Sequence, residues 1–584
     1  MKQSADLKRL LASIDHKSYP AYKDVRGAYD FNTYILSIDH VQGDPFASPS
    51  RVSVQIRHTK AGFPAELFDT PWKKTALEDY LLRCFSREIG RLSFKAKGSG
   101  KSGLIATSRP GQEVLSRTAC EIGKNEITAR FEVGFPAFGR TINSGELIRI
   151  FFDFLPGCVE SVFFYRRQNT AEIKKRITLA DDQQFIRNEL KRLDLVSFVA
   201  DGSILPRETG VSDRPMKGSV AFHSPDSLRI TLNLPGHGPI SGMAIRRGIT
   251  LIVGGGYHGK STLLKALESG VYNHIPGDGR EYVITDETAV KLRAEDGRSI
   301  NHVDISLFIR DLPNKKDTTC FSTADASGST SQAAAVIESI EAGTRAFLID
   351  EDTSATNFML RDDLMQRIVS RDKEPITPFI ERARDLYKQA GISTVLVAGS
   401  SGAYFFIADT IIQMDAYRPF DITKRVKNAC EQEVSKPAIQ APGFKLPTAG
   451  RKLAAGGTGR AVGAMALNFG DSRAEAGRNS DRNTRIKVRV HDKHSFQVAK
   501  EPVDLRFVEQ LADSEQTAAL AQMVRYCLEK GLLERCTVQE TVATLLKAYE
   551  TGGLSVFSDA SYAAMGLAMP RVQEIYACLN RFRG

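Results

Sequence analysis

The strongest chemical signal in the sequence is a glycine-rich run between an apolar segment and a helical one. It fulfils the pattern G-x-x-x-x-G-K-[ST] and consists of Gly254, Gly255, Gly256, Tyr257, His258, Gly259, Lys260, Ser261 and Thr262. Glycines let successive backbone N–H groups turn toward one phosphate, and the dipole of a following helix adds to the attraction. We therefore predict a nucleotide-phosphate site in which Lys260 bridges the β- and γ-phosphates and the Ser261 hydroxyl binds Mg²⁺.

Two consecutive acids follow an apolar run downstream of that loop. The run covers residues 346–349, and Asp350 and Glu351 come directly after it. Four apolar residues predict a strand inside a sheet, so Asp350 would emerge at the carboxyl end, where ligand sites of α/β proteins lie. We expect Asp350 to hold Mg²⁺ through water and Glu351 to polarise the attacking water. The alternative is a buried strand that ends in two solvated acids, and the upstream loop favours the catalytic interpretation.

A serine- and glycine-rich string precedes the acid pair. It contains Ser327, Gly328 and Ser329, and Ser327 lies 23 residues before Asp350. A serine and a glycine at a helix N-terminus form an anion site. The string resembles a variant of the ABC-ATPase signature LSGGQ, and its spacing from the acid pair resembles that of ABC ATPases. The resemblance implies contact with the γ-phosphate of a nucleotide held by a second subunit, whereas the string by itself would more often be a helix cap.

Five strings along the chain together resemble the family of predicted ATPases of the ABC class. They are HVQGDPFA (40–47), GGGYHGKSTLL (254–264), FSTADASGSTSQAA (321–334), LIDEDTSATNFM (348–359) and PRVQEIYACLNRFR (570–583). The resemblance implies an ABC-type ATP-binding core between family-specific amino- and carboxyl-terminal domains. It also implies a homodimer and relatives that are linked to RNA processing.

Two departures from transporter-type ABC ATPases bear on the chemistry. No glutamine occurs between Lys260 and Ser327, so the usual Q-loop ligand is absent, and Asp304 and Asp311 are the candidate replacements. No histidine follows the apolar run 395–398, where a switch histidine normally senses the γ-phosphate. We therefore expect hydrolysis that is slow or that uses another group. The short interval before Ser327 also leaves little room for the subdomain that docks on a membrane partner.

A second glycine-lysine string, residues 98–102, does not complete the phosphate-loop pattern. Lys95 stands where the pattern requires a glycine, and Lys97 adds a second cation nearby. The string therefore predicts a basic loop. Contact with the phosphate backbone of a nucleic acid and a plain solvated turn both remain open, and the turn is favoured.

The elements needed to position these residues suggest an α/β protein of several domains. Residues 1–200 mix strand-like runs (51–57, 127–133, 147–154) with helical patterns and predict an α+β domain, followed by a polar hinge at 201–213. Residues 215–426 alternate short apolar runs with helices, which predicts an ABC-type P-loop core with a mainly parallel sheet. Residues 437–480 are rich in glycine, proline and arginine and predict a loop or basic arm. Residues 485–584 predict a mostly helical carboxyl-terminal domain.

The positive charge is concentrated in one part of the chain. The 584 residues contain 79 Lys and Arg against 69 Asp and Glu, a net charge of +10. Residues 424–493 alone contain 15 basic and 6 acidic residues. Clustered cations gain affinity for phosphates by releasing counterions, so we predict a nucleic-acid partner, more plausibly RNA. A solvated basic linker is the alternative.

Composition excludes several classes of protein. Apolar residues make up 42% and charged residues 25%, which argues against disorder, collagen and coiled coil. No apolar run is long enough to span a bilayer and the start lacks a signal-peptide core, so we expect a cytoplasmic protein without a membrane partner. Eight scattered cysteines form no CxxC pair, which argues against a disulfide framework or a Cys-rich zinc site. The leading hypothesis is a homodimeric Mg²⁺-dependent ATPase acting on RNA; the alternative is an ATP-gated clamp with little hydrolysis and a protein partner.

Overall fold

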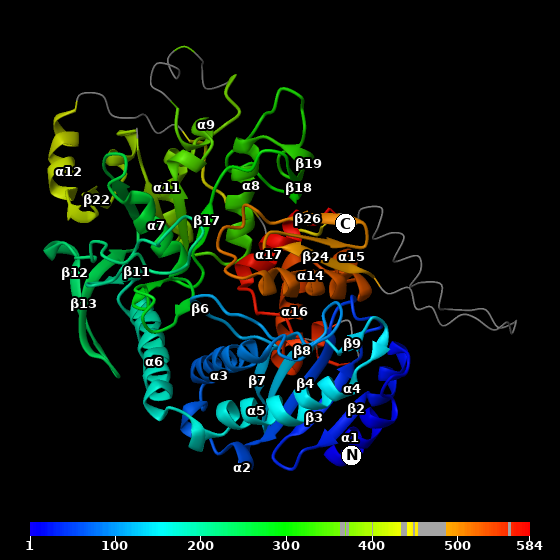
Figure 1. The fold of residues 1–584 in the computed structure, drawn as a ribbon. Coiled ribbons are helices and arrows are strands. Elements are labelled where there is room, and N and C mark those ends of the chain that lie inside the picture. The colour runs from blue at the N-terminus through cyan, green and yellow to red at the C-terminus, as the bar shows by residue number, and fades with distance from the viewer. Residues whose placement is uncertain are drawn as a thin grey trace, which may run out of the picture. The chain divides into compact units, whose positions relative to one another are not determined.

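The chain divides into two structural units in the computed structural model (Figure 1). The first contains residues 1–182 and 552–569, and the second contains residues 183–551 and 570–584. The structure describes residues 1–361, 368, 373–399, 401–433, 441–447, 450–453, 486–558, 562–563 and 565–583. The predicted loop or arm at 437–480 therefore lies mostly outside the described residues, which include only 441–447 and 450–453 of it.

A mainly antiparallel sheet forms the centre of the first unit. Its strand order is β1, β2, β3, β4, β8, β5, with β7 also paired to β8. The bounds are β1 Lys2–Gln3, β2 Gly27–Asp30, β3 Ile35–His40, β4 Ser50–Arg57, β5 Ile105–Ala106, β7 Cys120–Ile122 and β8 Glu126–Val133. Buried and less buried residues alternate strictly along β8, as expected for a strand with one face on a core. Helices α1 (Ser4–Ser13), α3 (Pro71–Leu92) and α5 (Leu155–Phe163) complete this core.

One predicted strand of this unit is wrong. Residues 147–154 form the end of α4 (Ser144–Ile148) and a π-helical segment (Arg149–Phe154), not a strand. The buried side chains in this stretch are Leu147, Ile150 and Phe151, which are spaced as on one face of a helix. The strand prediction assigns this apolar run a period of two residues, although its buried side chains follow the period of a helix.

A six-stranded, mostly parallel sheet carries the second unit, as the α/β prediction requires. Its order is β17, β20, β21, β14, β22, β23, and only the last pair is antiparallel. The bounds are β14 Ile249–Val253, β17 Val290–Leu292, β20 Ala346–Asp350, β21 Ser393–Val397, β22 Thr410–Asp415 and β23 Arg418–Asp421. Strands β20 and β21 are buried along their whole length, which is typical of a parallel sheet covered on both faces. The apolar runs at 346–349 and 395–398 lie largely within β20 and β21.

A second, antiparallel sheet lies in the same unit. It has the order β12, β13, β11, β16, with bounds β11 Leu195–Ala200, β12 Arg229–Leu234, β13 Gly238–Arg246 and β16 Val283–Thr285. Because β11 pairs with β13 and β16, residues 195–200 belong here, whereas we expected the amino-terminal domain to run to residue 200. The first unit ends at Asp182 instead.

The carboxyl-terminal residues combine a small sheet with helices. Strands β24 (Val488–Asp492), β25 (Ser495–Val498) and β26 (Glu501–Asp504) form an antiparallel sheet. The helices are α14 Ser514–Glu529, α15 Leu532–Arg535, α16 Val538–Gly552 and α17 Val572–Arg581. Residues 552–569 are grouped with the first unit, where Thr118 and Leu567 are joined by a backbone hydrogen bond. No helix in the described part of the chain has both the length and the apolar character to cross a membrane.

Candidate nucleotide-binding site

The predicted phosphate loop joins the end of β14 to the start of α7 (Lys260–Ser269). Gly254 has φ +142° and Gly259 has φ +96°, values that side chains rarely adopt. A Cβ atom on Gly254 would lie 2.3 Å from the carbonyl oxygen of Met414, so only glycine fits between the loop and β22. The backbone of residues 254–259 is therefore free to curl in front of the amino terminus of α7, which attracts anions.

Lys260 begins α7 and its side chain turns back over the loop. The Nζ atom donates hydrogen bonds to the carbonyl oxygens of Gly254 (2.7 Å) and Gly255 (2.8 Å). Ser261 follows in the first helical turn and is exposed, and Thr262 is half-buried. The loop thus holds one cation and one accessible hydroxyl at the same helix end.

The turn between β22 and β23 supports the loop from one side, which we did not predict from sequence. The Nδ1 atom of His258 lies 2.8 Å from Oδ1 of Asp415 and 2.9 Å from the backbone nitrogen of Ala416. The backbone N–H of Tyr417 donates to the carbonyl oxygen of His258 (3.1 Å). A Cβ atom on Gly259 would lie 2.9 Å from the Tyr417 ring, so the ring packs across the loop.

The acid pair lies at the same edge of the parallel sheet. Strand β21 separates β20 from β14, and its residue Val397 is in register with both Asp350 and Ile252. Asp350 is the last residue of β20 and is buried. Glu351 turns toward the end of β21, where its Oε2 accepts the backbone N–H of Gly399 at 2.6 Å. The carboxylate of Glu351 is therefore held at the end of β21, the segment after which a switch histidine is found in transporter-type ABC ATPases. Ser400, which follows Gly399, lies outside the described residues.

Ser327 caps helix α8 (Gly328–Glu341). Its hydroxyl lies 3.0 Å from the Thr330 hydroxyl and 3.4 Å from the Ser329 hydroxyl. Ser327 is exposed, Gly328 is half-buried and Ser329 is buried. The predicted anion site is thus a helix N-terminus with one accessible hydroxyl group.

Gln332 connects this helix to the segment after the acid pair. Its Oε1 accepts the backbone N–H of Ala355 (2.9 Å), and its Nε2 donates to the hydroxyl of Ser354 (3.0 Å). Ser354 in turn donates to the carbonyl oxygen of Asp350 (2.9 Å). The buried Gln332 side chain therefore couples the position of α8 to that of the acids.

The structure directs attention away from Asp304, one of the two acids considered as Q-loop replacements. Asp304 accepts the backbone N–H of Ser306 in its own turn after β18 (Arg298–Val303), a strand that pairs with β19 (Phe321–Ala326) in a separate sheet. The segment at the edge of the acids is instead the one that follows β17, since Leu292 is in register with Ile349. There the backbone N–H of Ala294 donates to the carbonyl oxygen of Thr353 (3.0 Å).

Mg²⁺ fits the residues at this site. Within the described residues, no three His, Cys, Asp or Glu side chains gather into a metal cluster. Mg²⁺ does not need one, because at phosphate sites it takes one or two protein oxygens and fills its shell with phosphate and water. Ser261 and the buried carboxylate of Asp350 would be that small donor set.

Family models match nearly the whole chain. The model of the "ABC_ATPase" P-loop domain matches residues 169–446, and the model described as "ATPase of the ABC class N-terminal" matches residues 4–166. The chain belongs to the ATPases of the ABC class. Residues 487–584 match the model of the MRB1590 C-terminal domain. Membership in this family supports ATP binding.

One curated relative is the uncharacterized protein MJ1628 of Methanocaldococcus jannaschii. It is 31% identical over 229 residues, which cover 38% of this chain and 50% of the relative. The chain thus matches about half the length of that protein.

Two solved structures are similar to part of the chain. One is cbiO1 from Clostridium perfringens, part of the ABC transporter complex cbiONQ, which is 14% identical with a TM-score of 0.26. The match covers 41% of this chain and 93% of the cbiO1 chain. The other is the ADP conformation of MJ1267, an ATP-binding cassette of an ABC transporter, which is 11% identical with a TM-score of 0.25. The match covers 41% of this chain and 95% of the MJ1267 chain.

Proposed function

We propose that this protein binds ATP with Mg²⁺ and hydrolyses it at composite sites formed by two copies of the chain, and that it couples this cycle to RNA. The observation that carries the proposal is the shared sheet edge of the phosphate loop and the acid pair. The loop follows β14 and the acids follow β20, with the end of β21 between them. Glu351 is already oriented by Gly399 at that edge.

Each residue has a defined role in this proposal. The backbone N–H groups of residues 254–259 and the Lys260 ammonium bind the β- and γ-phosphates, while Ser261 and Asp350 hold Mg²⁺, which would neutralise charge that develops on the phosphates. Glu351 accepts a hydrogen bond from the attacking water and orients it. Because Gly399 donates its backbone N–H to Glu351, the carboxylate stays fixed without a histidine partner.

The dimer follows from the position of the signature. Ser327 is exposed at the amino terminus of α8, and an exposed helix N-terminus attracts an anion such as a γ-phosphate. In the family resemblance this phosphate belongs to the nucleotide of a second copy. Ser327, Gly328 and Ser329 would then close over the loop of the partner, and hydrolysis would reopen the pair.

RNA is supported by the match to the MRB1590 C-terminal domain and by exposed cations in the same region. Lys487 and Arg489 are exposed, whereas the alternating residues Ile486 and Val488 are half-buried, which places the two cations on one side of the chain. Arg489 lies on β24, which pairs with β25 at one edge of its sheet. Arg478, Arg482 and Arg485, which extend this basic stretch, lie outside the described residues.

The experiment is a comparison of ATP binding and steady-state turnover, with and without single-stranded RNA, between the unaltered protein and Lys260→Ala. Lys260→Ala should lose tight ATP binding, because the loop would lose the only charge that spans the β- and γ-phosphates. Near-normal nucleotide affinity in that variant would refute the phosphate site. A circular dichroism spectrum of the variant controls for folding.

The same measurement decides between a motor and a clamp. The clamp is favoured by one observation, the backbone N–H of Gly399 at a position where a histidine normally assists hydrolysis. Turnover that RNA stimulates supports an ATPase acting on RNA. Tight ATP binding with negligible turnover under both conditions supports an ATP-gated clamp.

A further inference from the structure

Three phenylalanine side chains project into solvent from one loop cluster of the first unit. They are Phe46, Phe94 and Phe138, with exposed fractions of 63%, 52% and 63%. They come from three loops, residues 41–49, 94–104 and 134–140, which we call the phenylalanine loops. Exposed large apolar side chains are rare elsewhere in this unit, where Met1 and Val556 are the other examples among the described residues.

Backbone hydrogen bonds join the three loops to one another. The N–H of Lys101 donates to the carbonyl oxygen of Pro45 (2.8 Å), and the N–H of Ser99 donates to that of Ala137 (2.7 Å). The hydroxyl of Ser102 accepts the N–H of Ala137 (3.1 Å). The three aromatic rings are therefore presented by one connected structure.

A buried glutamine and a glycine contact fix this arrangement. Gln42 is 1% exposed; its Oε1 accepts the N–H groups of Ser50 (3.2 Å) and Phe135 (3.1 Å), and its Nε2 donates to the carbonyl oxygen of Asp44 (3.0 Å). Gly100 has φ +61°, and a Cβ atom there would lie 2.6 Å from the carbonyl oxygen of Pro45. The loops are thus packed backbone to backbone and preorganised.

The backbone conformation of Phe94 lowers the stability of the fold. Its φ is +63°, a value that is exceptional for a bulky residue. Strained backbone and exposed apolar rings both oppose stability, and such features concentrate where a protein binds something. The turn that ends α3 uses the backbone of Phe94, whose N–H donates to the carbonyl oxygen of Gly103 (2.7 Å), but folding of the first unit does not account for the exposed ring.

Positive charge surrounds the rings. Lys95, Lys97 and Arg140 are exposed, and Lys101 is half-buried. The one acid within the three loops, Asp44, is paired with Arg140 at 3.0 Å. Three lysines therefore remain beside the phenylalanines without an acid in the loops; just outside them, Glu146 accepts the backbone N–H of Lys97 at 3.0 Å.

We propose that the phenylalanine loops bind single-stranded nucleic acid, with bases stacked on Phe46, Phe94 and Phe138 and phosphates contacted by Lys95, Lys97 and Lys101. Aromatic rings in a basic groove are the common device for binding single strands, because every base has a face to stack. The lysines favour a polyanion over an apolar surface of a second copy. This inference rests on the nucleic-acid part of the proposed function and assigns it a site in the first unit.

The test uses the full-length protein and a fluorescent oligouridylate, with an RNA duplex of equal length as the second probe. Changing all three phenylalanines to Ala should weaken oligouridylate binding about tenfold or more, since loss of each stacked base costs affinity. Changing all three to Tyr keeps the rings and should retain affinity, whereas Leu keeps apolar volume without stacking and should behave like Ala. Duplex binding should change little.

A lysine variant separates the two contributions. Changing Lys95, Lys97 and Lys101 to Gln should flatten the slope of log K against log salt by about 0.7 per lost contact. The phenylalanine variants should leave that slope unchanged. Basal ATP turnover should be normal in all of them, because none of these residues belongs to the ATP site.

The outcomes distinguish this site from the broader proposal. If the unaltered protein binds RNA and the Ala variant binds it equally well, the site is refuted while the proposed function stands. If the unaltered protein binds no single strand, both the site and the nucleic-acid part of the proposed function are refuted. If the Ala variant is a folded monomer while the unaltered protein is a dimer, with RNA affinity retained, the loops are a contact between copies instead.

Discussion

Tyr257 is the least expected residue of the phosphate loop. It has φ +64°, a left-handed conformation that costs a side chain about 1–2 kcal/mol, and its ring is 99% exposed. A glycine would adopt this backbone without strain. Since the ring is almost fully exposed within the described part of one copy, we expect it to contact the second copy that closes over the loop.

Tyr257→Gly should therefore separate stability from dimer closure. The variant should be more stable by about 1 kcal/mol, because the left-handed strain is relieved, yet it should form less ATP-bound dimer. Thermal denaturation and analytical ultracentrifugation with ATP measure the two effects. Tyr257→Phe, which keeps the ring, is the matched control, and an unchanged dimer in the glycine variant would place the ring outside the interface.

Glu351→Gln should stop turnover but spare ATP binding. The amide oxygen of glutamine can still accept the N–H of Gly399, so the loop geometry survives, but the amide cannot polarise water. We expect turnover to fall by about 10²–10⁴-fold and an ATP-bound dimer to accumulate. Rapid-quench turnover and size-exclusion chromatography report these effects. Hydrolysis at the normal rate would show that another group activates the water.

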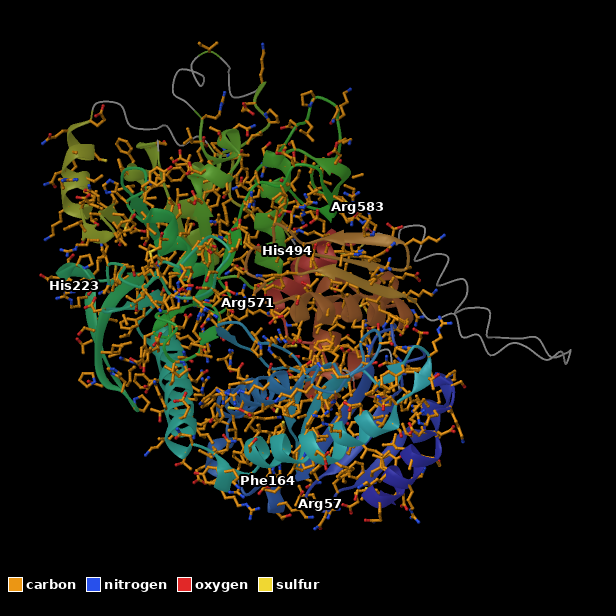
Figure 2. All side chains as sticks on the ribbon, viewed as in Figure 1. Arg57, Phe164, His223, His494, Arg571 and Arg583 are labelled. Carbon is orange, nitrogen blue, oxygen red and sulfur yellow. The ribbon has the colours of Figure 1, made fainter. Side chains whose placement is uncertain are left out.

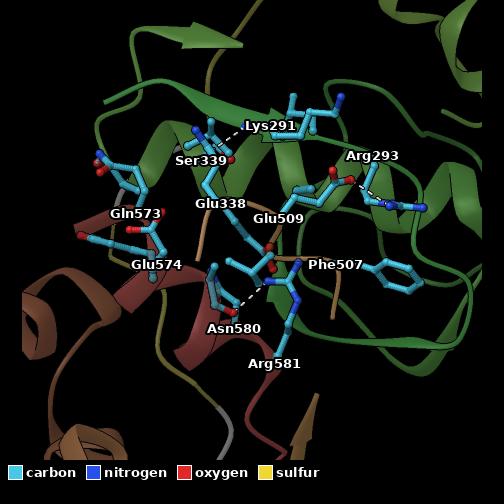
Figure 3. A pocket seen from close by; sticks show the side chains of 18 of the residues that line it. Lys291, Arg293, Glu338, Ser339, Phe507, Glu509, Gln573, Glu574, Asn580 and Arg581 are labelled. Atoms are coloured by element: carbon cyan, nitrogen blue, oxygen red, sulfur yellow. Dashed lines mark hydrogen bonds and ion pairs between the residues drawn. The ribbon is translucent and has the colours of Figure 1, made fainter. Parts of the chain in front are cut away.

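At the scale of elements, residues 293–297 connect helix α8 to the carboxyl-terminal helix α17. The N–H of Glu295 donates to the hydroxyl of Ser331 on α8 (2.9 Å). The carboxylate of Glu295 accepts a hydrogen bond from Nε of Arg581 on α17 (3.2 Å). Figure 3 shows Arg581 in the pocket that Glu338 of α8 and Glu509 also line. At about 50 Å³ this pocket is too small for a nucleotide, and its ionic lining ties the elements together.

The Glu295–Arg581 pair makes that connection sensitive to pH. Burial favours the neutral acid, but Arg581 and Arg298 outweigh it and lower the pKa of Glu295. An acid with a lowered pKa stabilises the fold above its unfolded pKa, and this contribution is lost as pH falls through the folded pKa. The second unit should therefore weaken in acid partly through this residue.

Arg581→Met tests the connection. At neutral pH the variant should lose about 3 kcal/mol, because the Glu295 carboxylate stays buried without its partner. The loss should shrink as pH falls and Glu295 becomes protonated. Chemical denaturation at several pH values measures it, with the exposed neighbour Arg583→Met as the control (Figure 2). An equal loss at every pH would mean that Arg581 acts through packing alone.

What the sequence could predict depends on how far apart the interacting residues are. The loop from Gly254 to Thr262 and the Asp350–Glu351 pair are local patterns whose neighbours announce a strand or a helix, so their elements could be predicted. The contacts of Glu295 with Arg581 and of His258 with Asp415 join residues far apart in the chain, and no local spacing indicates them. Residues 147–154 misled us because a short apolar run is compatible with either period.

At the scale of the whole molecule, two incomplete copies should restore one working site. If Ser327 serves the nucleotide of the second copy, Lys260→Ala disables the loop of its own chain and Ser327→Arg disables the site on its partner. Each variant alone forms a dimer with two defective sites. In a mixed dimer, the loop of the Ser327→Arg chain meets the intact signature of the Lys260→Ala chain, so one composite site contains all the required groups.

Mixing the two variants should therefore recover part of the ATPase activity, up to about a quarter of normal if chains pair at random and each site works alone. The reasoning is that half of the random dimers are mixed and each has one good site of two. Turnover of the mixture is compared with each variant alone, and subunit exchange is demonstrated by energy transfer between labelled chains. If exchange is complete and no activity returns, either the signature acts within its own chain or both sites must be intact. The mixed dimer can be isolated by giving each variant a different tag. If both sites must be intact for turnover, this dimer should still trap ATP at its one intact site. If the signature acts within its own chain, it should trap ATP at neither site.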